Sequence, residues 1–322
     1  MHAVHGGSSV RSFFNALLRK KPQINTSPSD SDVSSDQQEQ IASETSGVKA
    51  EEAVLSHYSK ISHLETTQYI VGVAQSIGIQ RDKNEDSIFT LTTNLVSNDT
   101  TINFGLYIVA DGMGGHDFGE LASSLAVGKF ASHVIDTFYL PLISSSGSLL
   151  DISIQEVMRL GVMNAHQAIR EKALGGGTTL TAALIIGDQI TIAHVGDSRA
   201  YSVDPDGAIQ LLTHDHSLVK RLEEIGQLTP DQASTHPKRN LLYRALGQGD
   251  TLEPDITTFQ VCRGCELLIC TDGLWGVIPE NELLNIIRSS SEPHLVCQTL
   301  IHSANAAGGP DNISVIIVRF PD

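Results

Sequence analysis

Short apolar runs rich in β-branched residues recur from Tyr69 to Arg319, and they narrow the choice of fold more than any other feature of the chain. Runs of this length and alternation predict strands. The predicted strands cover residues 69–75, 87–93, 103–110, 178–186, 189–195, 199–203, 208–212, 266–271 and 313–319. Helical periodicity covers residues 120–136, a stretch beginning near residue 151, and residues 279–289 and 293–306. Strands in hairpin succession, with helices in pairs, predict an α+β protein whose antiparallel sheets are covered by helices.

We predict a polar N-terminal extension, residues 1–66, followed by one domain, residues 67–322, because no second linker interrupts the patterned sequence. Residues 27–46 contain no basic and no aromatic residue, a composition typical of a disordered linker. Before them, residues 10–21 have apolar positions at helical spacing and a basic end, which indicates a short amphipathic helix. Such a helix suits docking to a partner or a membrane surface, although an isolated helix this short is only marginally stable.

The net charge of −16 limits the partners of the chain. Binding to nucleic acid depends largely on cations that replace counterions on the phosphates, so an acidic chain is a poor candidate for it. No apolar run approaches the roughly 20 residues of a transmembrane helix, and the start of the chain lacks the apolar core of a secretory signal. We therefore predict a cytoplasmic protein with no nucleic-acid partner and no transmembrane segment, and we take it to be a monomer.

The four cysteines, Cys262, Cys265, Cys270 and Cys297, predict free thiols in a reducing compartment. Cys262 and Cys265 form a single CxxC pair. A structural zinc site usually needs a second pair, which the sequence lacks. A turn between two strands is therefore the favoured interpretation of this pair, and a redox or zinc role is the alternative.

Acidic residues stand where predicted strands begin or end, often beside glycines. They are Asp111, Asp197, Asp272, Asp311 and the adjacent pair Glu85 and Asp86. Any one of these is typical of a turn. Carboxylates gathered at one end of a sandwich would repel one another unless a cation lay between them, and hard divalent cations with oxygen ligands are the natural answer. The carbonyl oxygen of Gly112 is a further candidate ligand, because a glycine lets the backbone approach a metal.

These residues belong to segments that closely resemble, in order along nearly all of residues 69–319, the bacterial form of the metal-dependent Ser/Thr protein phosphatases of type 2C. The segments are Arg81-Asp-Lys-Asn-Glu85-Asp86-Ser, Val109-Ala-Asp111-Gly-Met-Gly-Gly115-His, Gly176-Gly-Thr-Thr-Leu180, Val195-Gly-Asp197-Ser-Arg199-Ala-Tyr201, Leu212-Thr-His-Asp215-His-Ser217, Arg244-Ala-Leu-Gly247, Thr271-Asp272-Gly-Leu-Trp275 and Gly309-Pro-Asp311-Asn312. The resemblance implies a four-layer α-β-β-α sandwich, with two antiparallel sheets flanked by helix pairs and a binuclear metal site at one end.

The resemblance also implies a role for each site residue. Asp111 is expected to bridge two Mn²⁺ or Mg²⁺ ions, with Asp272 and Asp311 on the first ion and Glu85 and the Gly112 carbonyl on the second. Asp197, together with Asp272, matches a third and more weakly held metal position. Asp86 is expected to orient a metal-bound water, with a direct ligand role as the alternative, and Arg81 to grip the substrate phosphate.

The expected reaction is hydrolysis of phosphoserine and phosphothreonine in proteins by a water or hydroxide shared between the metals, opposing a Ser/Thr kinase. The family's eukaryotic members often carry a histidine where Met113 stands, so the residue that protonates the leaving group is not identified here. The nearby His116 is better explained as a residue in the first turn of a helix. The main alternative is a non-catalytic pseudophosphatase that binds phosphoproteins. A pseudophosphatase is expected to lack one of the residues Asp111, Asp272, Asp311, Glu85 and Arg81, and all of them are present. A two-metal nuclease is a second alternative, which the acidic charge opposes.

Residues 217–243 match a flap beside the active site in the family. Asp215 and Ser217 are expected to cap the helix of this flap. Arg199 is expected to be structural, with its guanidinium bound to carboxylates beneath the site. His194, within an apolar run, is expected to lie in the core or at a strand edge.

Overall fold

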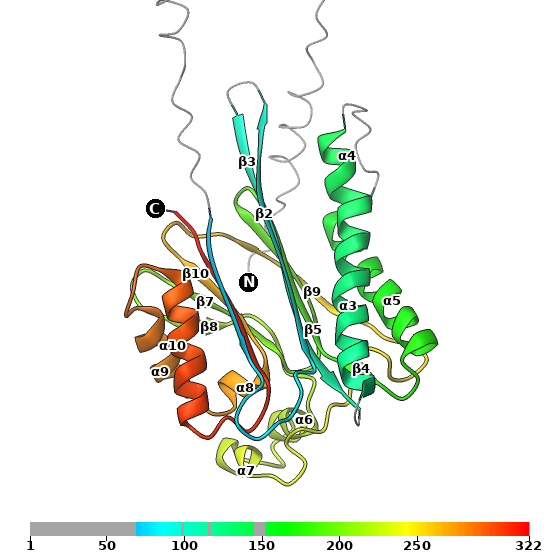
Figure 1. The fold of residues 1–322 in the computed structure, drawn as a ribbon, viewed down its shortest axis with the longest axis vertical. Coiled ribbons are helices and arrows are strands. Elements are labelled where there is room, and N and C mark those ends of the chain that lie inside the picture. The colour runs from blue at the N-terminus through cyan, green and yellow to red at the C-terminus, as the bar shows by residue number, and fades with distance from the viewer. Residues whose placement is uncertain (1–68, 98–99, 115–116, 145–151, 322) are drawn as a thin grey trace, which may run out of the picture. The chain divides into compact units, whose positions relative to one another are not determined.

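The computed structural model describes residues 69–97, 100–114, 117–144 and 152–321. The extension over residues 1–66, its predicted helix and linker, and His116 lie outside these residues. Within the described residues, the strands form two sheets (Figure 1). The first sheet has the order β1 (Ile70–Ser76), β11 (Ile313–Arg319), β10 (Glu266–Cys270), β7 (Arg199–Val203) and β8 (Ile209–Leu211). The second has the order β2 (Asp86–Ser97), β3 (Thr100–Met113), β5 (Leu180–Ile186), β6 (Gln189–Val195) and β9 (Asp255–Gln260), and β4 (Gly177–Thr178) pairs with β3.

Two groups of helices accompany the sheets (Figure 1). The first group is α3 (Asp117–Val134), its π-helical continuation η1 (Ile135–Tyr139), α4 (Leu140–Ile143) and α5 (Ile154–Lys172). The second group is α8 (Asp272–Trp275), α9 (Glu280–Ile287) and α10 (Pro293–Ala306). Two shorter helices, α6 (Leu218–Glu224) and α7 (Pro230–Ser234), form the segment expected to be a flap. Ser217 caps α6 as predicted, because its hydroxyl accepts a hydrogen bond from the Lys220 N–H.

Three apolar layers hold these elements together. Leu106 and Ile108 of β3 pack with residues of α3 and α5, whereas Tyr107 and Val109, which point to the other face, pack against the first sheet. On the far side of the first sheet, apolar residues of β10 and β11 pack with α9 and α10. Strands covered on both faces are mostly apolar, which explains the nearly continuous runs in the sequence. The predicted α-β-β-α sandwich is confirmed.

The observed elements differ from the predicted ones in three places. Strand β9 was not predicted, because it lies at the edge of the second sheet and its two exposed threonines are adjacent, which breaks the alternation expected of a half-buried strand. Asp272 begins the short helix α8 rather than a loop. Strand β3 continues through Met113, so Asp111 lies within a strand instead of following one. In the described part of the chain, no helix combines the length and the apolar character needed to cross a membrane.

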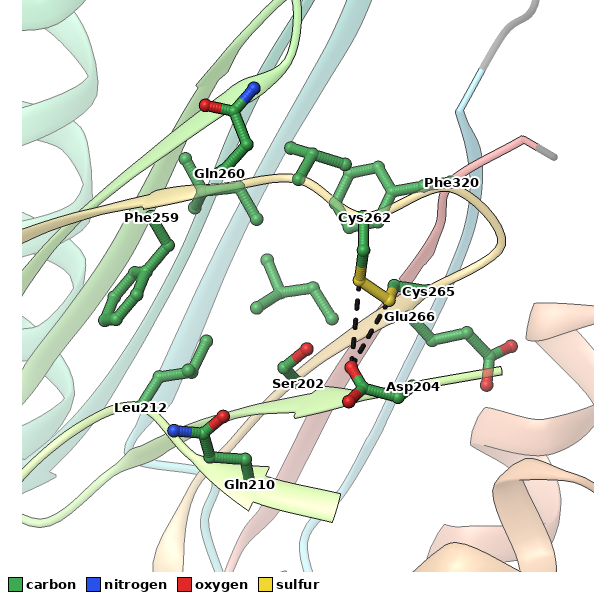
Figure 2. Close-up of a pocket in the computed structure, with 13 residues that line it drawn as sticks. Ser202, Asp204, Gln210, Leu212, Phe259, Gln260, Cys262, Cys265, Glu266 and Phe320 are labelled. Carbon is green, nitrogen blue, oxygen red and sulfur yellow. Dashed lines mark hydrogen bonds between the residues drawn. A yellow bond between two sulfur atoms is a disulfide. The ribbon is translucent and has the colours of Figure 1, made fainter. Parts of the chain in front are cut away.

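The cysteines differ from expectation as well. Cys262 and Cys265 form a disulfide, so the prediction of free thiols is wrong for this pair (Figure 2). Cys270 and Cys297 are free and buried, as predicted. The CxxC pair does lie in a turn between two strands, β9 and β10.

Candidate active site

The strand registers bring the predicted acidic residues to one end of the two sheets. In the first sheet, Cys270 pairs with Val315 and with Arg199, so Asp272, Asp311 and Asp197 all lie beyond the same sheet end. The end of β1 reaches this place too, because Ser76 pairs with Ile313. The loop that follows β1 carries Glu85 and leads into Asp86 at the start of β2. Antiparallel pairing therefore gathers residues that are far apart in the sequence.

Hydrogen bonds to its backbone N–H and carbonyl groups hold Asp111 in place. Its N–H donates to Thr179 Oγ1 at 2.9 Å, and its carbonyl oxygen accepts hydrogen bonds from the Thr179 N–H at 2.9 Å and from Thr178 Oγ1 at 2.8 Å. Thr179 Oγ1 in turn lies 2.7 Å from Ser198 Oγ. The threonines of the Gly-Gly-Thr-Thr motif thus fix Asp111 relative to the turn that carries Asp197.

Gly112 sits where only a glycine fits. A Cβ atom there would lie 2.2 Å from the Gly119 carbonyl oxygen of α3 and 2.6 Å from the Glu85 carbonyl oxygen. The Gly112 N–H donates to that Glu85 oxygen at 3.1 Å. A side chain on Gly119 would meet the Glu85 carboxylate at 2.7 Å. The glycines therefore allow Glu85, the β3 backbone and the start of α3 to approach one another closely.

Asn312 organises the loop that carries Glu85. Its amide Nδ2 donates to the carbonyl oxygens of Ile77 and Lys83, each at 2.8 Å, and its Oδ1 accepts from the Glu85 N–H at 2.8 Å. Asn312 also ties this loop to the neighbouring Asp311, whose Oδ1 accepts from the Asn312 N–H at 2.9 Å. The sequence prediction included Asn312 in a motif but gave it no role.

Asp86 is buried, and only one of its two carboxylate oxygens has hydrogen-bond partners in the protein. Its Oδ2 accepts hydrogen bonds from Thr271 Oγ1 at 2.9 Å and from Ser314 Oγ at 2.7 Å. Its Oδ1 is buried and has no protein partner. Burial raises the pKa of Asp86 to about 7, although the hydrogen bonds from the two hydroxyl groups act to lower it. The sequence prediction gave no role to these supporting residues, although Thr271 lies within a motif and Ser314 lies near the start of β11.

Three further carboxylates at this end, those of Asp111, Asp197 and Asp272, also have raised pKa values. Burial, and then the nearby Asp86, raises the pKa of Asp111 well above its usual range. Burial, and then Asp272, does the same to the pKa of Asp197. The pKa of Asp272 is raised to about 6, again by burial first and then by Asp311. These raised pKa values indicate that too little positive charge lies nearby to balance the buried carboxylates when they are ionised.

Arg81 is the cation that the structure places at the rim of this cluster. Its Nη2 donates to Asp311 Oδ2 at 2.7 Å, and about half of its side chain is exposed. The residue expected to grip phosphate is therefore bound to a residue expected to hold a metal. Its position at the open edge suits a guanidinium that presents its fork to an incoming phosphate.

The donor set fits hard divalent cations. It consists of carboxylates and one backbone carbonyl, the oxygen ligands that Mg²⁺ and Mn²⁺ prefer. One Asp272 oxygen, Oδ1, is buried without a partner, like Oδ1 of Asp86. Among the described residues, the trios of potential ligands whose atoms lie within 4.8 Å of one another are Asp204, Cys262 and Cys265, and His214, His216 and Asp255. The predicted carboxylates are more widely spread than these trios.

Beneath the cluster lies a second, fully paired network. Arg199 Nη2 donates to Asp215 Oδ2 at 2.7 Å and Nη1 to the Tyr201 hydroxyl at 2.9 Å, and the guanidinium stacks 3.6 Å above the Trp275 ring. The Trp275 Nε1–H donates to the Asp197 carbonyl oxygen at 3.0 Å. The structural role predicted for Arg199 is confirmed. The capping role predicted for Asp215 is wrong, because its carboxylate binds this arginine.

Histidines near the cluster have structural partners. His194 is buried, with Nδ1 2.9 Å from Thr181 Oγ1 and Nε2 3.0 Å from the His214 carbonyl oxygen. His216 Nδ1 accepts from the Gly196 N–H at 3.0 Å, and its Nε2 lies 3.1 Å from Asp255 Oδ2 and 3.0 Å from Arg244 Nη1. The core position predicted for His194 is confirmed.

The chain that follows the segment expected to be a flap is anchored beside Asp111. The Leu246 N–H donates to the Thr178 carbonyl oxygen at 2.9 Å, and the Thr178 N–H donates back to Leu246 at 3.1 Å. The two ends of the segment are joined to each other, because Ser217 forms a β-bridge with Leu242. The two helices of the segment, α6 and α7, therefore lie in a loop whose ends are joined at Ser217 and Leu242.

Comparison with known proteins agrees with the fold and with the motifs. Residues 82–304 match the family model described as protein phosphatase 2C. A serine/threonine phosphatase, Stp, of Listeria innocua serovar 6a is 39% identical over 215 residues, covering 66% of this chain and 84% of that protein. The solved serine/threonine phosphatase of S. agalactiae superposes with a TM-score of 0.68 at 32% identity, over 79% of this chain and 100% of that one. The catalytic domain of the serine/threonine phosphatase PstP, solved in complex with two manganese ions, gives a TM-score of 0.65 at 29% identity, over 79% and 99%.

The family match covers more than half of the chain, and the fold, the motif order and the relatives agree with it. The chain therefore belongs to the protein phosphatase 2C family, in its bacterial form, and is a protein serine/threonine phosphatase.

Proposed function

We propose that this phosphatase hydrolyses phosphoserine and phosphothreonine in proteins with the help of two Mn²⁺ or Mg²⁺ ions, and that it opposes a Ser/Thr protein kinase. The observation that carries the proposal is the meeting of Asp111, Asp272 and Asp86 at one end of the sheets, buried and with raised pKa values. Buried carboxylates of this kind are stabilised when a cation joins them. The PstP relative, described in complex with two manganese ions, supports the choice of metal.

The proposed ligands follow the predicted roles. Asp111 would bridge the two ions, with Asp272 and Asp311 on one of them and Glu85 and the Gly112 carbonyl oxygen on the other. Asp197 and Asp272 would provide a weaker third position. Asp86, whose buried Oδ1 has no hydrogen-bond partner in the protein, would orient a water at the site or bind a cation directly.

When bound, the cations would supply a nucleophilic water that is ionised near neutral pH and would neutralise charge on the phosphate. Residues of the chain position the ligands and bind the phosphate. The threonines behind Asp111 fix its position, Asn312 fixes the Glu85 loop, and Arg81 binds and orients the phosphate at the rim. Met113 provides no proton for the leaving group, so we infer that this proton comes from water at the site.

The proposal is tested by the release of phosphate from a phosphothreonine peptide by the full chain with Mn²⁺, with Mg²⁺ and with a chelator. We expect turnover with either ion and none with the chelator, restored when the metal is added back. A folded protein without turnover in any metal would instead be a pseudophosphatase, and its binding to the same peptide would then be measured.

Arg81→Ala is expected to lower kcat/KM roughly 10- to 100-fold, mainly through KM, because a charge-assisted hydrogen bond to phosphate contributes about 1.5–3 kcal/mol. Arg81→Lys keeps the charge but not the fork, so we expect an intermediate value. The Mn²⁺ concentration for half-maximal activity should not rise, because Arg81 competes with a cation for Asp311. Arg159→Ala, which removes an exposed arginine of α5, is the matched control. Unchanged kinetics for Arg81→Ala would remove this residue from the site.

We further propose that residues 67–322 form the catalytic domain, that residues 1–66 are an accessory extension, and that the protein acts as a cytoplasmic monomer. Its partners would be phosphorylated proteins and the kinase that modifies them.

A further inference from the structure

A second cluster of potential metal ligands lies at the opposite end of the first sheet. It consists of Cys262 and Cys265 in the turn between β9 and β10, and Asp204 in the turn between β7 and β8 (Figure 2). Cys265 immediately precedes β10, whereas Asp272 lies two residues beyond Cys270, the last residue of that strand. The five residues of β10, Glu266–Cys270, span roughly 16 Å at about 3.3 Å per residue, so the two clusters are separate.

The strand register explains why these three residues meet. Glu266 of β10 pairs with Val203 of β7, so the residues that flank this pair, Cys265 and Asp204, become neighbours. The Asp204 turn is closed by hydrogen bonds from the Asp204 N–H to Ala208 and from the Gly207 N–H to Asp204. Asp204 is therefore presented by a well-formed turn, and the CxxC pair acquires a third ligand that its own sequence does not contain.

The CxxC turn holds both sulfurs on the same side. The Cys265 N–H donates to the Cys262 carbonyl oxygen at 3.4 Å, and Gly264, with a φ of 67°, allows the chain to reverse between them. The Cα atoms of the two cysteines are 5.4 Å apart. Asp204 Oδ1 lies 3.7 Å from the Cys262 sulfur and 3.4 Å from the Cys265 sulfur. The three ligand atoms lie within 4.8 Å of one another, a spacing that one ion can span.

The surroundings leave room for an ion and its remaining ligand. The cluster borders a cavity of about 160 Å³ that Ser202, Gln210 and Phe259 also line (Figure 2). Cys265 is buried, whereas Cys262 and Asp204 are exposed and face solvent. Two thiolates and a carboxylate this close would repel one another in the absence of a cation. Sulfur ligands select soft or borderline cations such as Zn²⁺ over Mg²⁺, which the carboxylate cluster suits better.

We propose that the reduced Cys262 and Cys265 thiols, with Asp204, bind one thiophilic divalent cation of the Zn²⁺ type, which joins the β7–β8 turn to the β9–β10 turn. Two thiols lose their protons as the cation binds, and water completes the coordination. The disulfide seen in the structure is the alternative state of the same pair. It forms when an oxidant of the disulfide class accepts two electrons and two protons from the thiols, and it leaves no thiolate for a metal. This proposal does not depend on the proposed function.

The test uses the full chain, reduced under anaerobic conditions and titrated with Co²⁺ as a spectroscopic probe. We expect one equivalent of Co²⁺ to produce the near-ultraviolet charge-transfer absorption of a cobalt–thiolate bond. Added Zn²⁺ should abolish this absorption, and Mg²⁺ should not. Oxidation before the titration should prevent it and should lower the number of titratable thiols in the denatured chain from four to two.

Variants separate this site from the carboxylate cluster. Cys262→Ser with Cys265→Ser should remove the absorption and keep phosphatase activity, which also shows that the variant is folded. Asp204→Asn should weaken Co²⁺ binding at least about tenfold. Cys297→Ala, which removes a buried thiol elsewhere, and Asp272→Asn should leave the absorption unchanged. The proposal is overturned if the reduced, active protein shows no cobalt–thiolate absorption, or if the absorption persists without Cys262 and Cys265.

Discussion

Replacing Asp272 with asparagine is expected to lower kcat/KM for a phosphothreonine peptide by at least about a thousandfold at saturating Mn²⁺. Asp272 would hold the first cation and contribute to the weaker third position, and a bound cation supplies several kcal/mol of stabilisation to the transition state. About 4 kcal/mol corresponds to a thousandfold change in rate. An amide oxygen is a weaker ligand without charge, so more metal should restore little of the activity.

The same substitution is expected to have the opposite effect on the stability of the metal-free protein. The pKa of Asp272 is raised to about 6 from its ordinary value of 3.8, so its ionisation destabilises the fold. A group with a raised pKa in the folded state loses its stabilising contribution as the pH rises from about 4 to about 6. At pH 7.5 this loss is complete and amounts to at most about 3 kcal/mol. Without metal, Asp272→Asn should therefore be at least as stable as the unmodified protein at pH 7.5, and thermal unfolding in chelator measures this.

Asp250→Asn is the matched control, because Asp250 is 92% exposed and pairs only with Arg170 at the surface. Its activity and stability should both stay close to those of the unmodified protein. Two results would count against the assigned role of Asp272: full activity of Asp272→Asn at ordinary Mn²⁺, or a loss of activity that is accompanied by unfolding. The first would remove Asp272 from the metal centre, and the second would make it a structural residue.

The fold was predictable because burial leaves a strong pattern in the sequence. Strands such as β5 and β11 are buried on both faces and are apolar at most positions, so their bounds follow closely from composition. Strand β9 pairs with β6 along one edge only, and its threonines carry no such pattern. The helix α8 spans Asp272–Trp275, which is too short for helical periodicity to show. These elements depend on tertiary contacts rather than on local preference.

Without the family resemblance, the site was predictable only as a set of residue types at strand ends. Their meeting at one sheet end depends on register, which a single sequence does not show. The roles of Thr271, Ser314 and Asn312 appear only when β10 and β11 are side by side and the Glu85 loop folds over them. Asp215 illustrates the limit of local reasoning. It precedes a helix and looks like a cap, yet the arginine of a distant strand is its partner.

That pairing leads to the largest expected effect on stability. Arg199→Ala is expected to lower the free energy of unfolding by about 3–5 kcal/mol, because it leaves the Asp215 carboxylate buried without its counter-ion. The Asp215 side chain is 5% exposed and that of Arg199 is 19% exposed, so water cannot replace the lost guanidinium at low cost. For a domain of this size, the change corresponds to a decrease in Tm of roughly 10 °C. Unfolding in urea and by heat, in chelator, measures the effect without a contribution from bound metal.

The unpaired charge, rather than the lost contact with Trp275, is the expected cause of this instability. Arg199→Ala combined with Asp215→Asn should then regain part of the stability, because the second change removes the buried charge. Arg159→Ala, which breaks an exposed pair with Glu156 on α5, should cost less than about 1 kcal/mol. If Arg199→Ala proves no worse than Arg159→Ala, then Asp215 does not need its counter-ion. If the double variant regains nothing, the stacking on Trp275 and the bond to Tyr201 account for the loss. In that case the support beneath Asp197 depends on packing instead of charge, because Trp275 is the residue that holds the Asp197 carbonyl.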